Sequence, residues 1–196
     1  DLELEMGARI GEIEEMCAPL QAAATQADAE GTRAFLESWV AMGDKLCLLA
    51  QEDESRGRLL SAGEKLSRAA IYLLTAERMQ AHSAPDRAAL YARMLDVFER
   101  GTRLSRENCE RVEIPYGSSV IAGLYVRAEG TSGRAPVLVQ VNGLDSTKEM
   151  KYRVGLPNWL AKRGVSSLVI DQPGTGEALR LHGLAARQIS EAWGTP

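Results

Sequence analysis

Apolar residues recur every three or four positions through the first part of the chain, which is the spacing of one face of an α-helix. The clearest such stripe runs through Phe35, Trp39, Met42, Leu46 and Leu49. Similar stripes predict three further helices, at residues 6–17 ahead of Pro19, at about 58–80, and from about 86 to 98. Short links between four helices favour antiparallel packing, with the aromatic residues Trp39, Tyr72, Tyr91 and Phe98 in the helix core.

From about residue 111 the pattern changes to short apolar runs separated by turns. Alternating apolar and polar residues predict strands at 112–116 and 119–127, and continuous apolar runs predict strands covered on both faces at 136–141 and 165–170. A helix at 156–163 joins the last two strands, which makes them parallel. The sequence therefore predicts an α/β protein, with a helical region at 1–110 and a sheet region at 111–196.

The charge pattern changes at the same place. Residues 1–110 hold 13 Lys/Arg and 20 Asp/Glu, whereas residues 111–196 hold 10 and 7. The net charge of −4 disfavours nucleic acid and anionic membranes as partners, and no apolar run approaches the roughly 18 residues that span a bilayer. The three cysteines, Cys17, Cys47 and Cys109, lie far apart, which favours free thiols in a reducing cytoplasm.

Two segments follow the predicted parallel strands, where α/β proteins bind ligands. In residues 142–148, Gly143 would let the backbone turn sharply and direct the N–H groups around Asn142 and Leu144 toward a developing oxyanion. The alternative is a plain turn, in which Asp145 or Ser146 caps the next helix. Residues 171–176 lack the glycine spacing of nucleotide-binding loops and are interpreted as a tight turn that shapes a pocket wall.

Other charged residues carry less information. The acidic run at 52–54 is interpreted as a solvated helix face, and Lys148, Lys151 and Arg153 as a basic surface cluster. His182 has no evident carboxylate partner, so we interpret it as a structural or pocket-lining residue. Metal-ligand spacings are absent from the sequence, and neither a metal nor another cofactor is expected.

Two motifs resemble a known family. Residues 142–149 read NGLDSTKE after a buried strand, and residues 171–177 read DQPGTGE after the next. Together they resemble the α/β-hydrolase superfamily, in the branch of the 2,6-dihydroxypseudooxynicotine hydrolases and the fungal polyketide-shortening hydrolases. Asn142 departs from the His or Gly that many α/β-hydrolases have there, and Ala178 from a frequent Ser. The resemblance implies that residues 1–110 form a helical cap and residues 111–196 the first strands of the hydrolase sheet.

The resemblance also implies a mechanism. A serine in a G-x-S-x-G turn attacks a carbonyl group, with His and Asp as partners. The second oxyanion donor falls on the Leu144 amide, with Gly143 and Asn142 shaping its loop. The substrate side of the site would include Asp145, Pro173, Gly174, Glu177 and His182. The branch implies cleavage of a carbon–carbon bond in a β-diketone, acyl-aryl or polyketide-like small molecule. Ester or lactone cleavage would use the same groups.

The sequence contains no G-x-S-x-G. In family order the nucleophile, acid and base all follow the point where this sequence stops. We therefore expect the chain to be inactive alone and to need the remainder of the hydrolase domain, from the same gene product or a second chain. The strand at 165–170 would then be an unpaired edge. A truncated small-molecule-binding protein, a helical interaction module and a homodimer remain alternatives.

Overall fold

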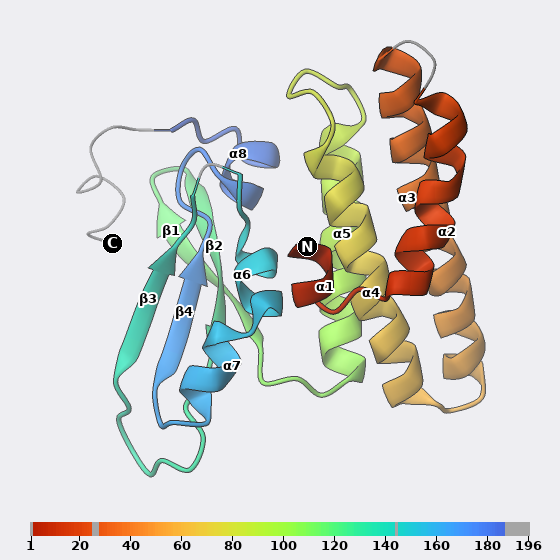
Figure 1. Ribbon diagram of the computed structural model, residues 1–196. Coiled ribbons are helices and arrows are strands. Elements are labelled where there is room, and N and C mark those ends of the chain that lie inside the picture. Colours follow the sequence, from red (N-terminus) through yellow and green to blue (C-terminus); the bar gives the residue numbers. More distant parts are fainter. Residues whose placement is uncertain (1, 25–27, 144, 187–196) are drawn as a thin grey trace. The chain divides into compact units, whose positions relative to one another are not determined.

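The computed structural model describes residues 2–24, 28–143 and 145–186 (Figure 1). Contacts between residues divide the chain into two units, residues 1–107 and residues 108–196. We call them the helical unit and the sheet unit.

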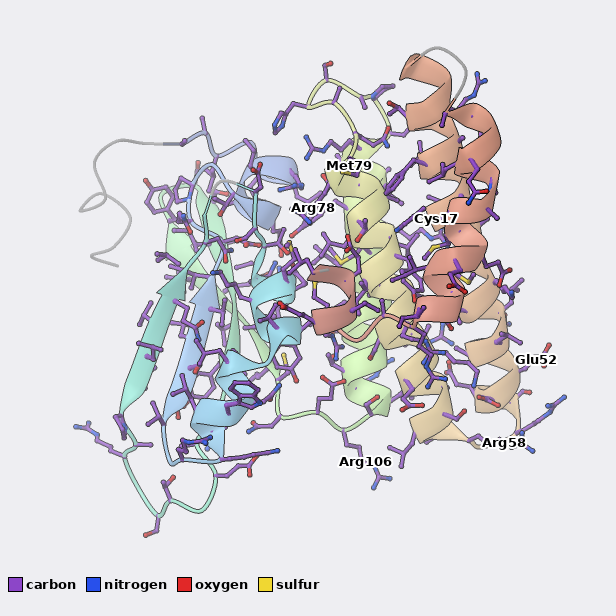
Figure 2. The ribbon with its side chains drawn as sticks, viewed as in Figure 1. Cys17, Glu52, Arg58, Arg78, Met79 and Arg106 are labelled. Atoms are coloured by element: carbon purple, nitrogen blue, oxygen red, sulfur yellow. The ribbon has the colours of Figure 1, made fainter. Side chains whose placement is uncertain are left out.

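The described residues of the helical unit form five helices. They are α1 (Leu2–Glu5), α2 (Ile10–Ala23), α3 (Asp28–Ser55), α4 (Leu59–Arg78) and α5 (Arg87–Leu104). From α2 onward each helix packs on the next one in the chain. The apolar stripes form the core, and all four aromatic residues predicted to lie there are buried: Trp39, Tyr72, Tyr91 and Phe98. At the turn between α3 and α4, Glu52 and Arg58 keep their charges exposed (Figure 2).

Three details of the helical unit differ from the sequence prediction. Met6 belongs to the predicted helix but lies in a turn ahead of α2, and α2 continues through Pro19 instead of ending before it. Proline removes one backbone hydrogen bond, but packing on α3 holds this helix, including a 2.6 Å bond from Ser38 Oγ to the Met16 carbonyl. Asp53 is buried rather than solvated, because Ser61 and Lys65 bond its carboxylate.

The sheet unit contains four strands and three short helices. They are β1 (Glu110–Tyr116), β2 (Ser119–Val126), β3 (Val137–Val141), α6 (Lys148–Val154), α7 (Leu156–Ala161), β4 (Ser166–Ile170) and α8 (Gly176–Arg180). The strand order is β1-β2-β4-β3. β1 and β2 form an antiparallel hairpin, β2 pairs antiparallel with β4, and β3 pairs parallel with β4. The predicted parallel pair is therefore confirmed.

Two predictions about this parallel pair were wrong: which strand lies at the edge of the sheet, and how far β3 is covered. β4 is not an unpaired edge, because β2 and β3 pair with its two sides. β3 is the edge strand of the described sheet, and it is not covered on both faces: Val137, Leu138, Val139 and Val141 are 51%, 42%, 56% and 47% exposed. A continuous apolar run indicates that a strand is suited to burial, but it does not say which segment buries it.

No helix among the described residues is both long enough and apolar enough to cross a membrane.

Candidate active site at the ends of two parallel strands

The site lies where β3 and β4 end side by side. Their last paired residues are Val141 and Ile170, so Asn142 and Asp171 leave the sheet at the same edge. We call residues 142–147 the first strand-end loop and residues 171–175 the second strand-end loop. The first leads into α6 and the second into α8. In open α/β sheets this is the place where ligands bind.

Asp171 connects the two loops. Its side chain is fully buried, and its carboxylate accepts hydrogen bonds from Asn142 Nδ2 at 2.5 Å and from the Lys148 backbone N–H at 2.8 Å. It also accepts one from Lys148 Nζ at 3.0 Å and one from the Glu177 backbone N–H at 3.0 Å. One carboxylate thus holds the start of the first loop and the first residues of both following helices.

Gly176 makes this arrangement sterically feasible. Its backbone is left-handed, with φ of +41°, and a Cβ atom there would lie 2.1 Å from Asp171 Cγ. Any side chain would therefore displace the carboxylate from its donors. This is a physical reason for the last glycine of the DQPGTGE motif.

Lys148 is the buried cation of the site. Its side chain is 1% exposed, and Nζ lies 2.7 Å from Glu149 Oε1, 3.0 Å from Asp171 Oδ2 and 2.7 Å from Glu177 Oε2. The prediction that Lys148 belongs to a surface cluster is wrong, because three carboxylates compensate the loss of its hydration. A lysine among charged neighbours gives no apolar signal that would have revealed this burial.

The charges of this cluster influence one another strongly. Burial alone would lower the pKa of Lys148, but Glu149, Asp171 and Glu177 together raise it, so the ammonium stays charged. Burial raises the pKa of Glu149. Burial also acts to raise the pKa of Glu177, but Lys148 and Arg111 outweigh it and hold that pKa below its ordinary value. Of these two carboxyl groups, Glu149 is therefore the one in which burial outweighs the attraction of Lys148.

Asn142 is held by its backbone and its side chain. Its backbone N–H donates to Gln172 Oε1 at 2.9 Å, and Gln172 Nε2 donates to its carbonyl oxygen at 2.5 Å. Its Nδ2 donates to the Ile170 carbonyl oxygen and to Asp171, both acceptors, which fixes the orientation of the amide. Its Oδ1 is buried and receives no hydrogen bond from the described residues.

The predicted oxyanion loop is only partly described. Leu144 lies outside the described residues. Gly143 is exposed, its φ is not left-handed, and a Cβ atom there would meet open space. The described backbone therefore shows no steric need for glycine at this position, although the chain does turn here, with the Ser146 N–H bonded to the Gly143 carbonyl oxygen. Neither Asp145 nor Ser146 is the N-cap of α6; that position is Thr147, whose side chain accepts from the Met150 N–H at 3.4 Å.

The residues predicted to lie on the substrate side have different environments. Asp145 is exposed, whereas Pro173 and Gly174 are buried in the second strand-end loop and Glu177 lies beneath it in α8. The His182 side chain is 28% exposed, and Nε2 lies 3.4 Å from Glu177 Oε1. His182 thus has a carboxylate neighbour that the sequence did not reveal, because four residues and a helix end separate the two.

Two further observations concern ligands. Among the residues that the structure describes, no group of three or more His, Cys, Asp or Glu side chains could hold a metal ion. Within the helical unit, a mostly apolar cavity of about 560 Å³ is lined by α3, the segment before α5 and α5 itself, including Leu36, Val40, Pro85 and Leu90. That volume is in the range of small-molecule pockets.

Comparison with known proteins assigns the fold. Hydrolase LUC6 from a Fusarium species is 31% identical over 182 residues, covering 89% of this chain and 41% of LUC6. Esterase FrsA from Vibrio cholerae is 28% identical over 141 residues, covering 71% of this chain and 33% of FrsA. A crystal structure of 2,6-dihydroxy-pseudo-oxynicotine hydrolase matches with a TM-score of 0.68 and 21% identity, over 90% of this chain and 46% of that one. No family model matches.

The chain has the fold of the first part of an α/β-hydrolase. The resemblance predicted from the two motifs is confirmed, and so is the predicted fold class, a helical region followed by the first strands of the hydrolase sheet. The chain spans less than half the length of these hydrolases.

Proposed function

We propose that this chain is the N-terminal portion of a serine-dependent α/β-hydrolase that cleaves a carbon–carbon bond next to a carbonyl group. The substrate class is a β-diketone, an acyl-aryl compound or a polyketide-like molecule, and the acyl group passes to water. The observation that carries the proposal is the joining of the two strand-end loops through Asp171, at the sheet edge where α/β proteins bind ligands. Similarity to a named hydrolase over 89% of the chain supports it.

In this proposal the first strand-end loop stabilises the oxyanion. When the serine attacks, negative charge develops on the carbonyl oxygen, and fixed backbone N–H donors lower the energy of that state. The Leu144 amide is the proposed donor, with Gly143 and Asn142 shaping its surroundings. The exposure of Gly143 suits close approach of a substrate. Asp145, Pro173, Gly174, Glu177 and His182 are the proposed substrate side of the site.

The proposed partner of this chain is the remainder of the hydrolase domain, which supplies the nucleophile, the acid and the base. The exposed apolar edge of β3 supports this partner, because an edge strand with unpaired backbone groups and exposed Val and Leu side chains is suited to pair with a further strand. The three cysteines are free thiols, which suits the reducing cytoplasm proposed as the location.

The experiment is an assay of the full gene product on a β-diketone and on the ester of matching shape. We expect the diketone to be cleaved, and a fluorophosphonate to label one serine outside residues 1–196. Residues 1–196 expressed alone are the control and should hydrolyse neither compound. A gene product that labels no serine and cleaves neither compound would contradict the proposal. It would favour a binding protein, for which the apolar cavity of the helical unit is the starting point.

Ester or lactone hydrolysis by the same groups is the second candidate. The similarity to esterase FrsA favours it. The ratio of kcat/KM for the ester to that for the β-diketone separates the two, because both reactions share the oxyanion step but differ in the leaving group. A ratio well above one would favour the esterase.

A further inference from the structure

We propose that Gln172 is a positioning residue for this hydrolase, one that fixes the direction in which the first strand-end loop leaves the sheet. The inference rests on the proposed function, because it concerns the direction in which the proposed oxyanion-binding N–H groups point. Gln172 is the second residue of the DQPGTGE motif and was not among the residues that the sequence singled out.

The geometry resembles a sheet ladder that has been extended by a side chain. The pairing of β3 with β4 ends at Val141 and Ile170. Beyond this pair, the Ile170 carbonyl oxygen accepts from the side-chain Nδ2 of Asn142, where a backbone N–H would have continued the ladder. The backbone of Asn142 is bound by the Gln172 amide instead, since its Oε1 accepts from the Asn142 N–H at 2.9 Å and its Nε2 donates to the Asn142 carbonyl oxygen at 2.5 Å.

Two bonds to one residue's backbone restrain rotation as well as position. A single hydrogen bond would let the backbone of Asn142 turn about the bond axis, whereas a paired donor and acceptor oppose that rotation. The next residue, Gly143, is exposed, and a Cβ atom built there would have no neighbouring atom within 4 Å. Steric contacts therefore do not fix the backbone at this position. The direction of the loop beyond this point therefore depends on how Asn142 is held.

The other end of the loop is held independently. Asp171 accepts from the Lys148 backbone N–H, and Thr147 caps α6. Inside the loop, the Ser146 N–H donates to the Gly143 carbonyl oxygen at 3.2 Å. Loss of the Gln172 contacts would leave the start of the loop held only through the Asn142 side chain while the other end stays fixed, which tilts the loop rather than unfolding it.

The effect on catalysis follows from the geometry that the transition state demands. A displacement of about 1 Å in a group that positions the reaction can cost roughly 100-fold in rate. Oxyanion donors act mainly on the transition state, so their misplacement lowers kcat more than it changes substrate binding. Gln172 is half-buried and uncharged, and its removal leaves the ion cluster around Lys148 intact.

The test is Gln172→Met in the full gene product. This change keeps the length of the side chain and removes both hydrogen bonds to Asn142. We expect kcat to fall by roughly 10- to 100-fold with KM within about threefold. The affinity for a trifluoromethyl ketone analogue of the substrate, which mimics the tetrahedral intermediate, should fall by the same factor as kcat/KM. Gln51→Met, the same change at an exposed position of α3, is the matched control and should alter neither quantity.

Gln172→Glu provides a second variant. It keeps an acceptor for the Asn142 N–H but places a carboxylate oxygen against the Asn142 carbonyl oxygen, so the loss of kcat should exceed that of Gln172→Met. A lower melting temperature with kcat and analogue affinity unchanged in either variant would overturn the proposal, because Gln172 would then be a structural residue only.

Failure of the proposed function has a different signature. The wild-type gene product would then turn over neither the ester nor the β-diketone. In that case hydrogen exchange of the peptide containing residues 142–147 decides the positioning claim. Faster exchange in Gln172→Met than in wild type supports the restraint of the loop, and equal exchange overturns it.

Discussion

The helical unit and the sheet unit use buried charges differently. In the helical unit Lys65 meets one carboxylate, that of Asp53, and the lysine side chain is 23% exposed. In the sheet unit Lys148 is 1% exposed and faces three carboxylates. The helical unit does bury one further pair, Arg87 with Glu77, where α5 begins close to the end of α4. In the helical unit the apolar stripes therefore define the core, and the ion pairs only supplement its stability.

In the sheet unit the charges determine the shape of the site itself. The bonds of Asp171 and Lys148 join the two strand-end loops to α6 and α8, so no apolar contact could replace them without changing the loops. Matched substitutions in the two units test this difference. The change in unfolding free energy should be greatest at Gly176, which packs against the Asp171 carboxylate, and least at Thr147, the N-cap of α6.

Gly176→Ala should have the largest effect. The new methyl group would lie within 2.1 Å of Asp171 Cγ and would displace the carboxylate from its donors. Breaking a buried ion pair costs about 3–5 kcal/mol, so denaturant unfolding should show a loss of that size or greater. Gly57→Ala in the helical unit is the control: its φ is +71° but a Cβ atom meets nothing within 4 Å. Backbone strain alone should cost it about 1–2 kcal/mol. Equal losses would contradict the role assigned to Asp171.

Lys148→Met should have the second largest effect on stability. It leaves the carboxylates of Glu149, Asp171 and Glu177 without their buried cation, which we expect to cost about 3–5 kcal/mol in unfolding free energy. Lys65→Met removes a partly exposed cation from Asp53 and should cost about 1 kcal/mol or less. A loss at Lys65 as large as that at Lys148 would remove the distinction between the two units.

Glu149→Gln should have a smaller effect, and a stabilising one. Because burial raises the folded-state pKa of Glu149, its folded carboxyl keeps a proton that the unfolded one releases as the pH rises above the ordinary Glu value. The wild-type protein therefore loses stability from this group with rising pH, and glutamine removes that loss. The melting temperature of the variant should exceed that of wild type at about pH 7–8, and the difference should vanish near about pH 4.

Glu177 changes stability in the opposite direction, since its folded-state pKa lies below the ordinary value. It contributes stability above the ordinary Glu pKa and loses it as the pH falls. Wild type and Glu149→Gln both contain Glu177, so its contribution cancels in the difference between their melting temperatures. Glu64→Gln, the same substitution at an exposed position of α4, is the matched control. A wild-type protein more stable than the Glu149→Gln variant at about pH 8 would refute the assignment.

Thr147→Ala should have the smallest effect. Loss of an N-cap hydrogen bond costs about 1 kcal/mol, and the Thr147 side chain accepts from the Met150 N–H at the start of α6. Asp86 occupies the same position of α5 but makes no side-chain cap bond. Asp86→Ala should therefore change the unfolding free energy by only a few tenths of a kcal/mol. Thermal unfolding of both variants measures the difference.

The same contrast explains what the sequence could predict. Helices α3, α4 and α5 follow from apolar periodicity, because a helix core is built from residues that the period selects. The bounds of helix α6 were not predicted, because its first turn begins with Lys148 and Glu149, which are buried yet charged. The motifs marked both loops, but motif residues do not state which donor meets which acceptor. The roles of Asp171 and Gln172 depend on contacts between segments about 30 residues apart, which only the fold supplies.

The position in the sequence of the donors that bond to Asp171 has a consequence for synthesis on the ribosome. Its named donors all lie between residues 142 and 177. In the proposed hydrolase, the oxyanion side of the site can thus assemble during translation, before the segment that carries the nucleophile has emerged. Until a further strand pairs with it, β3 exposes its apolar side chains to water, and it is the segment that a chaperone would be expected to bind.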